Sequence, residues 1–147
     1  MSFKGKFKPK NPGKYKGDPT NIIYRSSWEF KLLTILDAHP DVIEYASEEL
    51  IIQYISPLDN KVHRYFPDFW VKKKNKEGQL ETVVIEVKPK YQTVQPEKKQ
   101  KATKRYIKEV STWMVNSAKW KAANQYCDQR DWKFMIMTEN ELFGKNV

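Results

Sequence analysis

The spacing of apolar side chains predicts a helix early in the chain. Between residues 26 and 38, apolar residues such as Leu32 and Leu36 recur at helical spacing. Ser26 is suited to the N-cap position, and the His39–Pro40 dipeptide stops a helix because the residue before proline avoids helical geometry. We therefore expect a helix over residues 26–38.

Short runs of β-branched and aromatic residues follow and predict strands. The expected strands cover residues 50–56, 62–71 and 80–88, separated by a turn at 57–60 and a loop at 75–78. Pro67 lies inside the second run and indicates an edge strand or a bulge there.

Helical patterning returns after Pro96, and a last strand follows it. We expect helices over residues 97–112 and 116–129 and a strand over 132–138. This order of helix, three strands, helices and strand predicts an α/β (α+β) fold, with a central mixed β-sheet flanked by helices.

The length of 147 residues suits one domain with its own core. Hydrophobic residues at 39% and aromatics at 14% argue against a disordered chain. The single cysteine, Cys127, excludes an internal disulfide and a multi-cysteine zinc site, and we expect it to pack inside the second helix. We expect no membrane partner, because no apolar run reaches the length of a membrane span, and the N-terminus has no secretory apolar region.

The formal net charge of +9 favours a polyanionic partner such as DNA, and the charge is unevenly placed. Residues 1–17 carry six lysines and no acid, together with glycines and prolines that disfavour regular structure. We interpret 1–17 as a flexible basic arm that binds phosphates, and 18–147 as a single domain. A solvated tail that only aids solubility is the alternative.

A second basic cluster spans residues 88–108, with eight basic residues and one acid, Glu97. A solvated helix face explains this cluster as well as a DNA-contacting face does. Asn116 is a further weak candidate for a DNA contact. The candidate phosphate contacts of the whole chain are Lys8, Lys10, Lys14, Lys16, Arg25, Lys90, Lys98, Lys101, Lys104, Arg105 and Lys119.

Two carboxylates and a lysine near the ends of predicted strands carry the candidate chemistry. Glu86 and Lys88 project to the same face because alternate residues of a strand share a face. If strands 62–71 and 80–88 are neighbours, Asp68 lies beside Glu86. Carboxylates are hard oxygen ligands that hold Mg²⁺, and the carbonyl of Val87 would add another oxygen.

Such a site would hydrolyse a phosphodiester. The ion polarises the phosphate and activates a water, and Lys88 orients that water and offsets the developing charge. Mn²⁺ is expected to substitute for Mg²⁺. Ordinary surface ion pairs are the alternative, because a short pattern of this kind occurs by chance.

Glu29 is the third candidate ligand. It falls within the apolar stripe of the first helix, where a carboxylate needs a partner. A metal site would supply that partner, but a capping box, in which Glu29 bonds back to the Ser26 amide, explains it equally well. Glu48 and Glu49 are expected to be solvated turn acids, with a second pair of ligands as the alternative. His63 is expected to be a plain strand histidine rather than a phosphate contact.

These residues together resemble the PD-(D/E)XK nuclease superfamily, and more closely the head-completion nucleases of large contractile-tailed bacteriophages. The distinctive segments are 7–12 (FKPKNP), 14–17 (KYKG), 24–29 (YRSSWE), 46–49 (ASEE), 64–69 (RYFPDF) and 86–89 (EVKP). The resemblance implies a restriction-endonuclease-like core with Asp68, Glu86 and Lys88 in the central catalytic roles and Glu29 as the helix-borne acidic ligand. Lys119 is our candidate for the superfamily's further helix-borne residue.

The implied activity is Mg²⁺-dependent, structure-selective cleavage of double-stranded or branched DNA during head completion. The resemblance further implies portal or head proteins as partners, and assembly in the host cytoplasm with the virion as a second location. The alternatives are a non-catalytic DNA- and portal-binding head protein, and a junction resolvase of the same superfamily.

Overall fold

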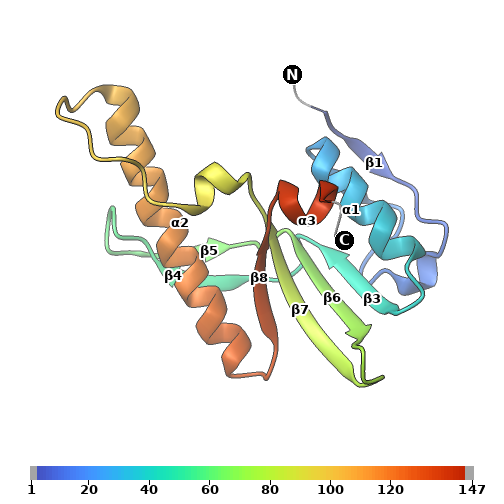
Figure 1. Cartoon of the computed structure of the whole chain (residues 1–147). Helices are drawn as coiled ribbons and strands as arrows, with labels where there is room; N and C mark the ends of the chain where they lie inside the picture. The colour runs from blue at the N-terminus through green and yellow to red at the C-terminus, as the bar shows by residue number, and fades with distance from the viewer. Residues whose placement is uncertain (1–2, 145–147) are drawn as a thin grey trace.

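A mixed four-stranded sheet organises the computed structural model, which describes residues 3–144 (Figure 1). Its strand order is β3-β6-β7-β8, antiparallel except for the parallel pair β7–β8. The strands are β3 (Val42–Ser47), β6 (Phe69–Lys74), β7 (Leu80–Val87) and β8 (Lys133–Met137). The predicted α/β class with a mixed sheet and flanking helices is confirmed.

Helices cover the two faces of this sheet (Figure 1). The helices are α1 (Ser27–Ala38), α2 (Lys104–Asp128) and the short α3 (Glu139–Phe143). Side chains alternate along β6 and β7, so Val71 and Ile85 pack in the cluster that contains α1, while Trp70 and Val84 pack against Cys127 of α2. Cys127 is 1% exposed, as expected for a packed cysteine.

Two smaller ladders flank the sheet. Strands β4 (Ile52–Ile55) and β5 (Val62–Tyr65) form a hairpin whose inner residues pack on α2. Strands β1 (Gly5–Phe7) and β2 (Ile22–Tyr24) pair antiparallel. Two single-turn helices complete the elements, η1 (Pro12–Lys14) and η2 (Lys90–Thr93).

The first helix agrees with its prediction, and several other boundaries do not. Ser26 caps α1 by accepting a hydrogen bond from the Glu29 amide at 3.1 Å. The expected strand 62–71 is broken at residues 66–68 into β5 and β6, and β3 was not predicted. The two helices expected over 97–112 and 116–129 are one helix, α2, which Thr103 caps.

The expectation that residues 1–17 hold no regular strand is wrong. Strand β1 lies in this segment, and Phe7 and Tyr15 are 8% and 6% exposed within the core. The buried carboxylate of Asp37 fixes the same segment, because it accepts hydrogen bonds from the backbone amides of Lys10 and Asn11. Burial of two aromatic rings outweighs the weak local propensity of this glycine- and proline-containing stretch.

Candidate active site

The pairing of β6 with β7 brings Asp68 next to Glu86. Phe69 is paired with Ile85 in an antiparallel ladder. Asp68, the residue before Phe69, therefore lies opposite Glu86, the residue after Ile85. The backbone amide of Val87 donates a 2.7 Å hydrogen bond to Oδ2 of Asp68 and fixes that carboxylate at the end of the strand. The expected proximity of Asp68 and Glu86 is therefore observed.

Glu86 is buried among polar partners. It is 7% exposed, and its Oε1 accepts a 2.7 Å hydrogen bond from the Tyr65 hydroxyl. The ammonium of Lys88 lies 3.7 Å from Oε2, which agrees with the expectation that Glu86 and Lys88 share a face. Burial raises the pKa of Glu86, while the Tyr65 hydrogen bond and the charges of Lys88 and Lys119 oppose that rise.

Lys119 approaches this group from α2. Its Nζ lies 5.6 Å from the centre of the Tyr65 ring, and its charge acts on Glu86. Lys119, the candidate for the superfamily's further helix-borne residue, thus lies near enough for its charge to act on Glu86, and its role stays a prediction.

Three carboxylates gather beside Glu86. Glu29, Glu48 and Asp68 each place one oxygen within 4.8 Å of the other two. Burial and then the charge of Glu86 raise the pKa of Asp68, and Glu29 adds to the effect. Burial also raises the pKa of Glu29, against the opposing hydrogen bond from Ser26. The cationic side chains of the protein therefore do not fully offset the negative charge of these carboxylates.

One half of the expected capping box is formed at Glu29, and its carboxylate bonds to the Ser26 hydroxyl instead of the Ser26 amide. The Ser26 hydroxyl accepts from the Glu29 amide and donates to Oε2 of the Glu29 carboxylate at 3.2 Å. The same carboxylate belongs to the acidic cluster. The helix cap therefore orients a side chain that faces the site.

Glu48 lies in the acidic cluster, so it is not the solvated turn acid that the sequence analysis favoured over a second pair of ligands. Its backbone has φ of 55°, and its amide donates a 3.1 Å hydrogen bond to the Asp68 carbonyl. Its carboxylate forms an ion pair with Arg25. Glu48 follows β3. Because β3 was not predicted, the sequence did not indicate that this strand ends beside Asp68. Glu49 lies apart from this cluster and accepts a hydrogen bond from Tyr15.

The donor set suits a hard divalent cation. Carboxylate oxygens are the protein ligands that Mg²⁺ and Mn²⁺ prefer, and the raised pKa values indicate acids that a cation would stabilise in their charged form. Asp68, Glu29, Glu48 and Glu86 are the residues that would hold it. The role of the Val87 carbonyl stays a prediction.

The basic candidates do not form one surface. The ammonium of Lys14 donates to the carbonyls of Asp37 and His39 at 2.9 and 2.8 Å, at the end of α1 remote from Glu29. Lys16 lies 4.5 Å from the centre of the Trp70 ring, and Arg25 pairs with Glu48. Lys8 and Lys10 are exposed, as are Lys90, Lys98, Lys101, Lys104 and Arg105 near η2 and the start of α2.

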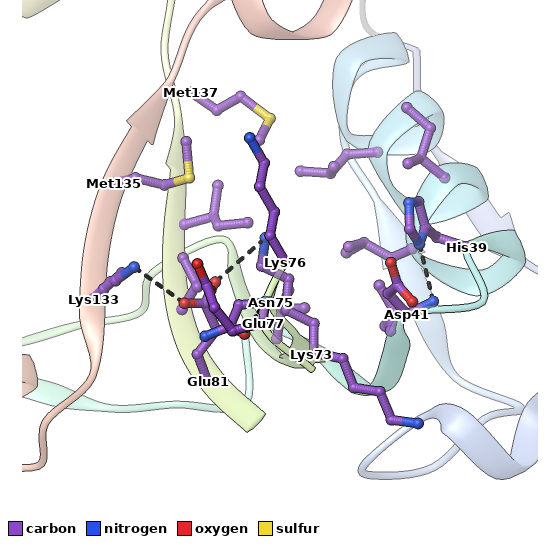
Figure 2. Close-up of a pocket in the computed structure, with 18 residues that line it drawn as sticks. His39, Asp41, Lys73, Asn75, Lys76, Glu77, Glu81, Lys133, Met135 and Met137 are labelled. Carbon is purple, nitrogen blue, oxygen red and sulfur yellow. Dashed lines mark hydrogen bonds and ion pairs between the residues drawn. The ribbon is translucent and has the colours of Figure 1, made fainter. Parts of the chain in front are cut away.

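A cavity between α1 and the sheet lies apart from the clustered carboxylates. It has a volume of about 550 Å³ between α1 and the sheet, with Met135 and Met137 on one wall and Lys73, Glu81 and Lys133 near its rim (Figure 2). None of the clustered carboxylates lines it. The chemistry is therefore assigned to the acidic cluster and not to this cavity.

Comparison with known proteins agrees with this geometry. Residues 39–139 match the family described as "TnsA-like endonuclease N terminal", a range that includes Glu48, Asp68, Glu86 and Lys88 but not Glu29. The chain belongs to this endonuclease family. It is also 42% identical to the "Head completion nuclease" of Enterobacteria phage T4 over 146 residues, which cover 97% of this chain and 95% of that protein.

The resemblance to head-completion nucleases inferred from the sequence is thereby confirmed at the level of the family. The TnsA-like endonuclease match agrees with the mixed α/β fold. Within residues 3–144, no helix is long and apolar enough to cross a bilayer.

Proposed function

We propose that this member of the TnsA-like endonuclease family is a Mg²⁺-dependent endodeoxyribonuclease that acts on phage DNA during head completion. The observation that carries the proposal is the convergence of Glu29, Glu48 and Asp68, with oxygens within 4.8 Å, next to the Glu86–Lys88 pair. These side chains come from α1 and from the ends of β3, β6 and β7, and together they form one polar site.

The residues of the site divide into three roles in the proposed reaction. Asp68, Glu29, Glu48 and Glu86 hold the cation, which when bound polarises the scissile phosphate and acidifies a water. Tyr65 fixes Glu86 through its hydroxyl. Lys88 is 29% exposed at its side chain, which lets its ammonium meet a phosphate oxygen and balance charge that develops there.

Selectivity for a DNA structure, rather than a base sequence, is part of the proposal. The basic residues are spread over several surfaces and suit contacts to the phosphate backbone. The head completion nuclease relative supports action at a phage head in the host cytoplasm and contact with portal or head proteins, which we propose for this chain as well.

Replacement of Asp68 tests the proposal directly. We expect Asp68→Ala to abolish cleavage of linear and branched DNA in Mg²⁺, because the side chain holds the centre of the cluster, while DNA affinity measured in EDTA stays within about twofold. The measurement is gel-based cleavage alongside fluorescence anisotropy.

Asp41→Ala is the matched control, because Asp41 is exposed and lies at the other end of α1. Cleavage by Asp68→Ala at the wild-type rate would refute the catalytic assignment. Binding by wild-type protein with no cleavage in either Mg²⁺ or Mn²⁺ would instead identify a non-catalytic DNA-binding head protein.

A further inference from the structure

A groove runs between α2 and η2, the single-turn helix that follows Lys88 in the chain. Its volume is about 490 Å³, a size common for small-ligand sites. Tyr91 contributes to one wall, and Trp113 and Asn116 of α2 contribute to the other. Figure 1 shows the η2 turn, in yellow, between the end of β7 and α2.

Both walls continue directly from the candidate active site. Tyr91 follows Lys88 by three residues, through Pro89 and the start of η2. Asn116 precedes Lys119 by three residues on α2, which corresponds to a rise of about 4.5 Å along the helix. A strand of DNA with a phosphate at Lys88 therefore has its neighbouring nucleotide within reach of this groove.

The side chains of the groove suit a nucleobase. Tyr91 exposes 73% of its surface, and Trp113 is held edge-to-face against Trp120 with ring centres 6.1 Å apart, so one ring is accessible and the other is fixed. Asn116 is 7% exposed and lines the groove, where an amide can both donate to and accept from a base edge.

Positive charge completes the groove at its outer end. Arg105 and Lys108 line it from one face of α2 and are exposed, and Glu109, which also lines the groove, forms an ion pair with Arg105. Aromatic rings that stack on bases, combined with cations that contact phosphates, are the features that bind unpaired nucleotides. A base paired within a duplex cannot enter such a concave site, because its faces are covered by neighbouring bases.

We propose that the groove between η2 and α2 binds one unpaired nucleotide adjacent to the scissile phosphate, so that DNA with an unpaired base is the preferred substrate. This inference rests on the proposed nuclease function. It assigns to Tyr91, Trp113 and Asn116 a role in selecting the DNA structure.

The experiment uses a DNA duplex with one unpaired 2-aminopurine and a fully paired duplex of the same length, both in EDTA. We expect wild-type protein to quench the 2-aminopurine fluorescence and to prefer the unpaired duplex. Tyr91→Leu should reduce that preference about 5- to 100-fold, since removal of one stacking ring costs that much in affinity. Tyr91 is largely exposed, so the exchange leaves the core intact.

Tyr106→Leu is the matched control, because Tyr106 lies on α2 but does not line the groove. It should leave both affinities unchanged. The inference is overturned if the fluorescence is not quenched, or if Tyr91→Leu weakens both duplexes equally. This experiment measures fluorescence and DNA affinity in EDTA, and no cleavage. A negative result would therefore overturn the nucleotide-binding groove alone, whereas the nuclease proposal is tested by Mg²⁺-dependent cleavage.

Discussion

At the scale of single residues, the carboxylates of the site lie close together although their negative charges repel one another. Burial and the charge of Glu86 raise the pKa of Asp68, so the folded chain binds a proton there more tightly than the unfolded chain does. The stability of the metal-free protein therefore falls as pH rises from the unfolded carboxyl pKa, near 4, toward the raised folded-state value.

Asp68→Asn should weaken this pH dependence. The amide removes one buried charge, so the variant should exceed wild type by about 1–3 kcal/mol in free energy of unfolding at pH 8, with the gap closing toward pH 5. The measurement is chemical denaturation in EDTA across that range, with Asp41→Asn as the exposed control. Parallel wild-type and Asp68→Asn curves would contradict the electrostatic account.

The residues of the site differ in how readily the sequence identifies them. Asp68, Glu86 and Lys88 can be identified because strand periodicity determines which residues share a face, and the register of β6 with β7 agrees with it. Glu48 was only an alternative ligand and Tyr65 was missed, because their positions depend on β3 and on the β4–β5 hairpin, whose contacts are long-range.

At the scale of elements, strong local patterns were predicted and tertiary contacts decided the rest. The cap and apolar stripe of α1 are local, so that helix was predicted well. Strand β3 lacks simple alternation, with Ala46 and Ser47 both buried at its end, and pairing with β6 stabilises it. Within the expected strand 62–71, the break at residues 66–68 separates Tyr65, which ends β5, from Asp68, which precedes β6, and both lie close to Glu86.

The attachment of the N-terminal segment to α1 gives a prediction at this scale. Asp37 is 3% exposed and accepts hydrogen bonds from the Tyr45 hydroxyl at 2.9 Å and from the Lys10 amide at 2.9 Å. Asp37→Ala should lower the free energy of unfolding by about 3 kcal/mol, because it leaves these donors without an acceptor.

Thermal unfolding measures this decrease, and limited trypsin digestion should show faster cleavage between residues 8 and 17. Asp41→Ala again serves as the control. Unchanged stability together with unchanged cleavage between residues 8 and 17 would indicate that Asp37 does not anchor the segment.

At the scale of the whole molecule, the basic residues behind the net charge of +9 differ in their surroundings. Some make structural contacts within the fold, and others are exposed. Deletion of residues 1–17 would remove Phe7 and Tyr15 from the core, so charge exchange is the cleaner test of DNA contact. The ammonium of Lys14 is occupied by helix carbonyls, which leaves Lys8, Lys10 and Lys16 as the exposed candidates for phosphate binding in this segment.

Replacing Lys8, Lys10 and Lys16 together by Gln should weaken DNA binding and reduce the slope of log affinity against log salt by about 0.9 for every phosphate that is no longer neutralised. The slope is measured by anisotropy between about 50 and 200 mM salt. The variant Lys61→Gln, Lys74→Gln, Lys76→Gln changes the net charge equally at other exposed positions. Equal slopes for the two triple variants would assign the effect to overall charge.

The parallel pairing of β7 with β8 has a consequence for how the protein is made. Residues 83–87 pair with residues 133–137, and the amide of Lys88 donates to the carbonyl of Met137. The strand that bears Glu86 therefore keeps an open edge on the ribosome until β8 has been synthesised. A chain terminated before β8 would lack this edge partner, so the strand that carries Glu86 takes its place inside the sheet only after residues 133–137 have been made.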